Sequence, residues 1–196
     1  MSDTHTATTH TATTHAATTH TATTHTATTH TATTHTATTH TATTAPAPAR
    51  ATPADTVTGM VEHVLALAAT WTRWDGEPAH VDGRVYTPHK AVRRVADHLV
   101  DHLAEMEARL AGRPTQPDHW HASATTTDAD RAPFTPDDLD EARSRLTRLA
   151  RIWADRLDAL TPEQLDDSPG EGWSFRELAR HLGESVYYAD AVGDLT

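Results

Sequence analysis

Residues 87–112 read TPHKAVRRVADHLVDHLAEMEARLAG, and this stretch decides the fold class of the chain. Thr87-Pro88 provides a helix start, because a threonine hydroxyl can cap the first turn and proline suits the first helical position. Gly112 is a common residue just past a helix end. Apolar residues recur between them at helical spacing, at Val92, Val95, Leu99, Leu103, Met106 and Leu110. The stretch therefore predicts a long amphipathic helix with one buried face.

Three further segments carry a start signal followed by an apolar stripe of helical period. They begin at Thr52-Pro53, at Thr135-Pro136 and at Ser174, where Glu177 completes a capping box and Trp173 and Leu178 suit a hydrophobic staple. The apolar stripe of the first segment continues to Trp71 and Trp74, and that of the last continues to Ala189. Thr161-Pro162 starts a short helical turn, and residues 80–86 predict a hairpin around an Asp-Gly turn. Four amphipathic helices and one long connection, residues 113–134, predict an all-α four-helix bundle.

The N-terminal part of the chain has a different character. From Thr4 to Thr44 it repeats a five-residue unit, essentially THTAT, without any large apolar residue. The repeat carries a histidine at positions 5, 10, 15, 20, 25, 30, 35 and 40. Such a tract has nothing to bury against the entropy cost of ordering, so residues 1–51 are predicted to be a disordered tail and residues 52–196 the folded domain. A metal buffer, acid-triggered charging and a repeat expansion without a role are alternative interpretations of the tail.

Composition excludes several classes of function. The net charge is −11, which disfavours binding of the folded part to nucleic acid. The chain has no cysteine, so disulfides, thiolate nucleophiles and cysteine-based zinc sites are excluded. It also shows neither a secretory signal nor an apolar run of roughly 20 residues, so we expect a cytoplasmic protein that does not insert into a membrane.

Histidines on the predicted helices are the candidate metal ligands. His98 and His102 have i,i+4 spacing, and so do Glu177 and His181. Residues four apart lie on adjacent turns of one helix face, where a pair can bind one ion such as zinc or nickel. His102 and His181 lie nearest to the apolar stripes, which favours a site of His102, His181 and Glu177. His98 and His63, the latter at a flank of the first helix, are the alternate ligands.

Structural roles compete with this interpretation. Glu177 is also the capping-box residue of the last helix, and a boundary histidine such as His102 can simply form a hydrogen bond while its ring packs. His98 also suits a solvated position. Trp120 in the connection is a candidate lid over one end of the helices. Phosphate-binding glycine loops and nucleophile-elbow motifs are absent from the sequence.

Two segments resemble a known family. Residues 87–112, together with the last helical segment WSFRELARHLGESVYYADAVGDL at residues 173–195, are similar to the DinB-like superfamily, more narrowly to its actinobacterial members. The resemblance covers roughly residues 55–196. It implies an up-down-down-up four-helix bundle, often a homodimer, that commonly holds a divalent metal through one ligand from the second helix and two from the last. Relatives include mycothiol-dependent maleylpyruvate isomerase and other enzymes that use a thiol cofactor.

The resemblance places candidate ligands on this chain. The second helix offers His102 or His98, and the last helix offers His181. Many relatives have a second histidine four residues later, where this chain has Ser185, whereas the isomerase-like pattern has a glutamate four residues earlier, which Glu177 matches. We therefore expect a metal-binding protein that acts as a thiol-dependent transferase or isomerase. The alternatives are a non-catalytic interaction or stress-response protein, and a metal buffer that works through the tail.

Overall fold

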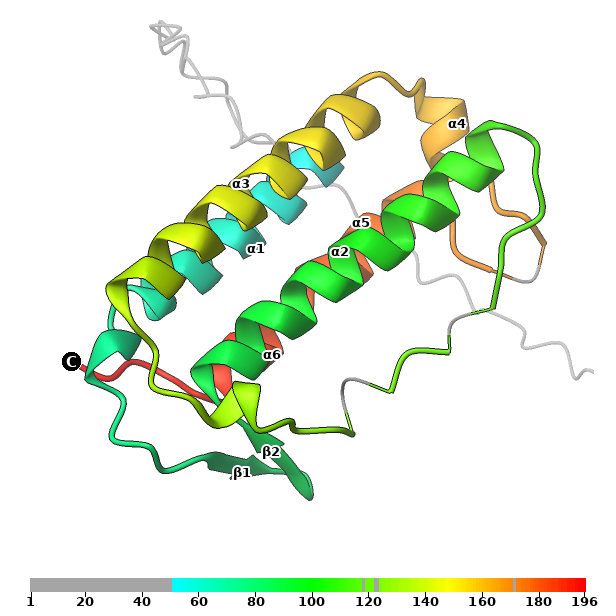
Figure 1. The fold of residues 1–196 in the computed structure, drawn as a ribbon. Coiled ribbons are helices and arrows are strands. Elements are labelled where there is room, and N and C mark those ends of the chain that lie inside the picture. Colours follow the sequence, from blue (N-terminus) through cyan, green and yellow to red (C-terminus); the bar gives the residue numbers. More distant parts are fainter. Residues whose placement is uncertain (1–50, 118, 122–123, 171) are drawn as a thin grey trace, which may run out of the picture. The chain divides into compact units, whose positions relative to one another are not determined.

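The computed structural model describes residues 51–117, 119–121, 124–170 and 172–196, and the predicted tail lies almost entirely outside them. This part of the chain is mostly helical and has one small sheet (Figure 1). The elements are α1 (Pro53–Ala68), η1 (Trp71–Arg73), β1 (Ala79–Val81), β2 (Arg84–Tyr86), α2 (Pro88–Leu110), η2 (Ala129–Arg131), α3 (Pro136–Asp158), α4 (Pro162–Asp166), α5 (Phe175–Gly183) and α6 (Val186–Asp190). None of the described helices combines the length and the apolarity that a membrane span requires.

The predicted helix starts are confirmed. The capping residues of α1 to α5 are Thr52, Thr87, Thr135, Thr161 and Ser174. In each case the side-chain hydroxyl accepts a hydrogen bond from the backbone N–H three residues later, which satisfies a donor that the helix itself leaves free. These local signals fix where each of these five helices begins.

The core lies between the longer helices. Helix α1 packs against α3, α5 and α6, and α2 also packs against these three helices (Figure 1). Leu99 and Met106 of α2 are fully buried, as are Leu178 and Leu182 of α5. The fully buried Trp153 of α3 donates its indole N–H to the Leu99 carbonyl oxygen at 3.0 Å, so α3 and α2 are joined by a hydrogen bond inside the apolar core.

Two predicted helices end earlier than their apolar stripes suggest. Helix α1 ends at Ala68, and the buried Trp71 belongs to the separate turn η1. The last helix, expected to be continuous, divides into α5 and α6 around Ser185, where the Ser185 N–H bonds to the Leu182 carbonyl at 2.9 Å, three residues back. Gly183 lies just before this break, and a Cβ atom there would approach Thr56 Cγ2 of α1 to 2.8 Å. Gly183 therefore faces α1 directly before the break.

The predicted hairpin is confirmed. Strands β1 and β2 pair antiparallel with His80 opposite Val85. Asp82 and Gly83 have φ values of 50° and 72°, as a two-residue turn of this kind requires. The hairpin delivers the buried Tyr86 directly to the start of α2.

A buried carboxylate attaches the long connection to α2. Asp130 of η2 is 3% exposed and accepts two hydrogen bonds from Arg93, from Nε at 2.9 Å and from Nη2 at 2.7 Å. The backbone N–H of Thr127 adds a third at 2.7 Å. Burial raises the pKa of Asp130, but the bonds from Arg93 and Thr127 outweigh it, so the pKa lies below its usual 3.8. This bidentate pair fixes the end of the connection beside α2.

Replacing this carboxylate is expected to destabilise the fold. Asp130→Asn removes the charge partner of Arg93, which is still about one-third exposed, so we expect a loss of about 2 kcal/mol in the free energy of unfolding. Urea unfolding measures the loss. Asp140→Asn, a change at a surface carboxylate, is the control and should have almost no effect. Equal stability of the two variants would contradict the proposed anchoring role.

Because its pKa is lowered, the contribution of Asp130 to the free energy of unfolding should be lost in acid. The ionised form stabilises the folded state above pH 3.8, and this contribution is lost as the pH falls through the lower pKa of the folded state. The difference in unfolding free energy between the wild type and Asp130→Asn should therefore shrink between about pH 7 and about pH 3. A difference that stays constant over this pH range would contradict the stabilising role of the ionised Asp130 carboxylate.

Candidate metal centre

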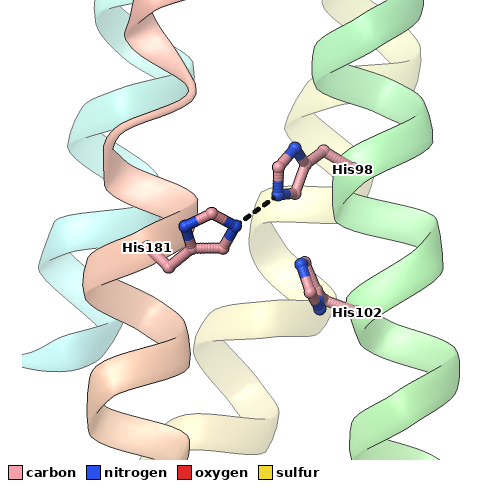
Figure 2. A group of neighbouring side chains, drawn as sticks. All are labelled: His98, His102 and His181. Atoms are coloured by element: carbon pink, nitrogen blue, oxygen red, sulfur yellow. Dashed lines mark hydrogen bonds between the residues drawn. The ribbon is translucent and has the colours of Figure 1, made fainter. Parts of the chain in front are cut away.

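Three histidines from two helices meet at one point. Helix α2 supplies His98 and His102, and α5 supplies His181 (Figure 2). One ring nitrogen of each lies within 4.8 Å of the other two. Nε2 of His98 and Nε2 of His181 are 2.9 Å apart. The ring centroids are separated by 4.8 to 5.3 Å, so the three rings surround a common space.

The core positions these rings. His98 precedes and His102 follows the fully buried Leu99 on α2, so both histidines lie at the border of the apolar stripe. His181 lies between the buried Ala179 and Leu182 on α5. All three rings are partly buried, and their spacing depends on how α2 packs against α5.

Carboxylates orient two of the rings from behind. Glu105 Oε2 lies 2.9 Å from His102 Nδ1, and Glu184 Oε2 lies 3.4 Å from His181 Nδ1. A neutral imidazole that donates Nδ1–H to a carboxylate keeps a lone pair on Nε2, the tautomer that a metal ligand needs. The hydrogen bond from His102 also lowers the pKa of Glu105, against the effect of burial, and keeps this carboxylate ionised. The His102 ring is therefore held in an orientation suited to ligation, and the exposed Glu184 offers the His181 ring a longer contact on the same side.

The environment of His181 favours its neutral form. Burial lowers the pKa of His181, and the nearby His102 lowers it further. Glu184 and Glu105 oppose this change without reversing it. Since a transition metal binds the neutral imidazole, a lowered pKa prepares His181 for ligation near neutral pH.

A small pocket opens onto the histidines. It has a volume of about 260 Å³ and is lined, in addition to the three histidines, by Arg94, Asp97, Asp101, Trp120 and Trp173. The Trp173 ring lies against His181, with the ring centroids 4.2 Å apart. A larger cavity of about 840 Å³, lined by α2, by residues 113–117 and by Trp120, shares Asp101, His102 and Trp120 with this pocket. A molecule in either space can therefore contact His102.

The three side chains fit a divalent transition ion. Zinc binds imidazole nitrogen at about 2.0–2.1 Å, which places the nitrogens of a tetrahedral site about 3.3 Å apart. This value lies between the 2.9 Å that separates His98 Nε2 from His181 Nε2 and the 4.8 Å within which all three ligand nitrogens lie. Three neutral imidazoles would leave a further position for water or a substrate, as catalytic zinc sites do.

The structure combines the expected ligands differently. His102 and His181 lie together, and the alternate His98 completes the group. The Glu177 carboxylate instead accepts hydrogen bonds from the Ser174 backbone N–H at 2.9 Å and hydroxyl at 3.0 Å. It therefore closes the capping box of α5 and is not a member of the histidine group. His63 is exposed and lies 2.6 Å from Asp190.

Two residues of this centre were not identified from the sequence. Glu105 lies three residues after His102, a spacing at which side chains on a helix meet, and this was the available signal. Trp173 was assigned to a hydrophobic staple with Leu178, whereas its 44% exposed ring lies on His181. The local sequence offers no signal for this ring contact. Trp173 precedes α5 and His181 lies within it, so the contact depends on the direction in which the chain enters the helix.

Comparison with protein-family models, curated proteins and solved structures gave no match to this chain. The functional assignment therefore depends on the geometry of the three histidines and on the chemistry of the residues around them.

Proposed function

We propose that His98, His102 and His181 bind a divalent transition metal, zinc or nickel. One observation carries the proposal: three partly buried imidazole nitrogens lie within 4.8 Å of one another, on two different helices. Imidazole suits both metals, and two of the rings have a carboxylate behind them.

The proposal extends to a DinB-like four-helix bundle that acts as a thiol-cofactor-dependent transferase or isomerase. Its support is the resemblance of the helices that carry the histidines, together with two adjoining spaces that both reach His102. A thiol cofactor such as mycothiol would suit the larger space and a small substrate the smaller one. The ligand set differs from the family pattern, since two ligands come from α2 and one from α5.

The chain's own residues would have distinct tasks in such a reaction. A bound divalent ion supplies Lewis acidity, which lowers the pKa of a coordinated thiol or water. Glu105 fixes the tautomer of His102, and Glu184 does the same for His181. Trp120 and Trp173 line the pocket and limit the access of water.

Metal analysis of the full-length chain tests the site. The histidines at positions 5 to 40 are first replaced by asparagine, because the repeat can also bind metal ions. We expect this protein to retain about one equivalent of zinc, and His102→Ala or His181→Ala to lose most of it, since two ligands hold zinc much less tightly than three. His80→Ala, at an exposed hairpin residue, is the matched control. Equal zinc content in all these variants would refute the metal site.

Two glutamate variants separate ligand orientation from helix capping. Glu105→Gln removes the carboxylate behind His102 and should weaken zinc binding about tenfold, as changes of this kind usually do. Glu177→Gln keeps the capping geometry and should leave zinc affinity unchanged. Competition with a chromophoric chelator measures both affinities. A loss of zinc affinity in Glu177→Gln alone would instead favour the ligand set expected from the family.

The capping role of Glu177 has a separate readout. Glu177→Ala removes one half of the capping box and should lower the free energy of unfolding by about 1 kcal/mol. Thermal or urea unfolding of the metal-free protein measures this change. Glu62→Ala, at an exposed position in the middle of α1, is the control. Wild-type stability of Glu177→Ala would contradict the capping role.

A further inference from the structure

Arg109 joins α2 to the segment that leads into α5. Its side chain is 13% exposed. Nη1 donates to the Trp173 backbone carbonyl at 2.9 Å and lies 3.4 Å from Glu105 Oε1, and Nη2 lies 3.5 Å from the Asp167 carbonyl oxygen. The guanidinium group lies over the Phe175 ring, 4.0 Å from its centre. This one side chain therefore contacts a carboxylate of its own helix, the segment before α5 and the first residue of α5.

Two of these contacts lead directly to a ligand ring. Glu105 offers one oxygen to each side: Oε2 lies 2.9 Å from His102 Nδ1, and Oε1 faces Arg109. Trp173 also has two contacts, since its carbonyl accepts the bond from Arg109 and its ring centroid lies 4.2 Å from that of His181. Arg109 is thus one residue removed from ligands on both helices of the metal centre.

The two intermediate groups need a partner to stay in place. The Glu105 side chain is 30% exposed, and Trp173 is 44% exposed. A partly exposed side chain populates several rotamers, so ordering it when a metal binds costs free energy. Hydrogen bonds from a charged donor are roughly twice as strong as neutral ones. A guanidinium bonded to both groups would therefore order them before an ion arrives.

We propose that Arg109 is a positioning residue of the three-histidine metal centre, which holds Glu105 behind His102 and the Trp173 ring against His181. The inference rests on the proposed function and adds to it a residue that lies outside the histidine pocket. Two helices supply the ligands, so the geometry of the site depends on contacts that span both. The Arg109 guanidinium is such a contact, and zinc affinity therefore depends on it.

Zinc affinity is measured on the full-length chain with the asparagine-substituted repeat, by competition with a chromophoric chelator. We expect Arg109→Gln to weaken zinc binding about tenfold, as the loss of groups that support metal ligands usually does. Arg109→Lys should lose less, because lysine keeps the charge beside Glu105 but not the planar fork. Arg156→Gln is the matched control, since it removes an arginine of α3 that binds another glutamate of α2, Glu107, at 2.6 Å. This control should leave zinc affinity unchanged.

A double-mutant background distinguishes positioning from a general effect on helix packing. Glu105→Gln and Trp173→Leu together remove the carboxylate behind His102 and the ring against His181. In this background Arg109→Gln should change zinc affinity by less than about twofold. Urea unfolding of the metal-free proteins gives the effect of Arg109→Gln on stability. That effect should persist in this background, because the Trp173 carbonyl remains as an acceptor.

Cobalt supplies a readout that does not depend on affinity. The visible absorption of bound cobalt(II) reports the geometry of its ligands. At saturating cobalt we expect Arg109→Gln to change the intensity of these bands and Arg156→Gln to leave them as in the wild type. Arg109→Lys keeps a cation in place and gives the same test if Arg109→Gln folds poorly.

The outcomes separate the two proposals. Histidine-dependent zinc uptake, with equal affinities and equal cobalt spectra in the wild type and both Arg109 variants, would overturn the role of Arg109 and leave the metal centre intact. A loss of affinity that is just as large in the background without Glu105 and Trp173 would overturn that role too. Zinc uptake that does not depend on the histidines would overturn the proposed function, and the role of Arg109 would fall with it.

Discussion

The buried apolar stripe of α2 is the constraint on which the other features depend. Leu99 and Met106 are fully buried, so the helix cannot rotate about its axis without exposing them. With the rotation fixed, His98 and His102 are directed toward α5, and Arg93 is placed to bind Asp130. The burial of this one stripe thus places the three-histidine cluster on one flank of α2 and the attachment of the connection on another.

Much of the fold could be predicted from the sequence because its signals are local. A capping hydroxyl followed by proline at Thr87, or the capping box at Ser174, needs only three or four residues to act. The Asp82-Gly83 turn is local in the same sense. The break between α5 and α6 was not predicted, because the apolar stripe of the last segment continues past it to Ala189. The neighbour of Gly183 on α1, Thr56, is distant in the chain, so the sequence around Gly183 does not reveal it.

The candidate site shows the same division. The helices that carry His102 and His181 could be identified, and their i,i+4 partners could be named. The choice between Glu177 and His98 could not be made from spacing, because both satisfy it. The Glu177 carboxylate is occupied by hydrogen bonds at the start of its own helix. The position of His98 next to His181 depends instead on the packing of α2 against α5, which are far apart in the chain.

The glycine at position 183 has a consequence for the three histidines. Gly183 lies two residues after His181, and a Cβ atom there would come within 2.8 Å of Thr56 Cγ2 on α1. A side chain at this position would require Thr56 or the helix itself to shift, so Gly183 lets α5 lie as close to α1 as it does. The placement of His181 beside His98 and His102 is therefore tied to a contact on the opposite side of α5, and a change in the packing of α1 would reach the three imidazoles through the helix between them.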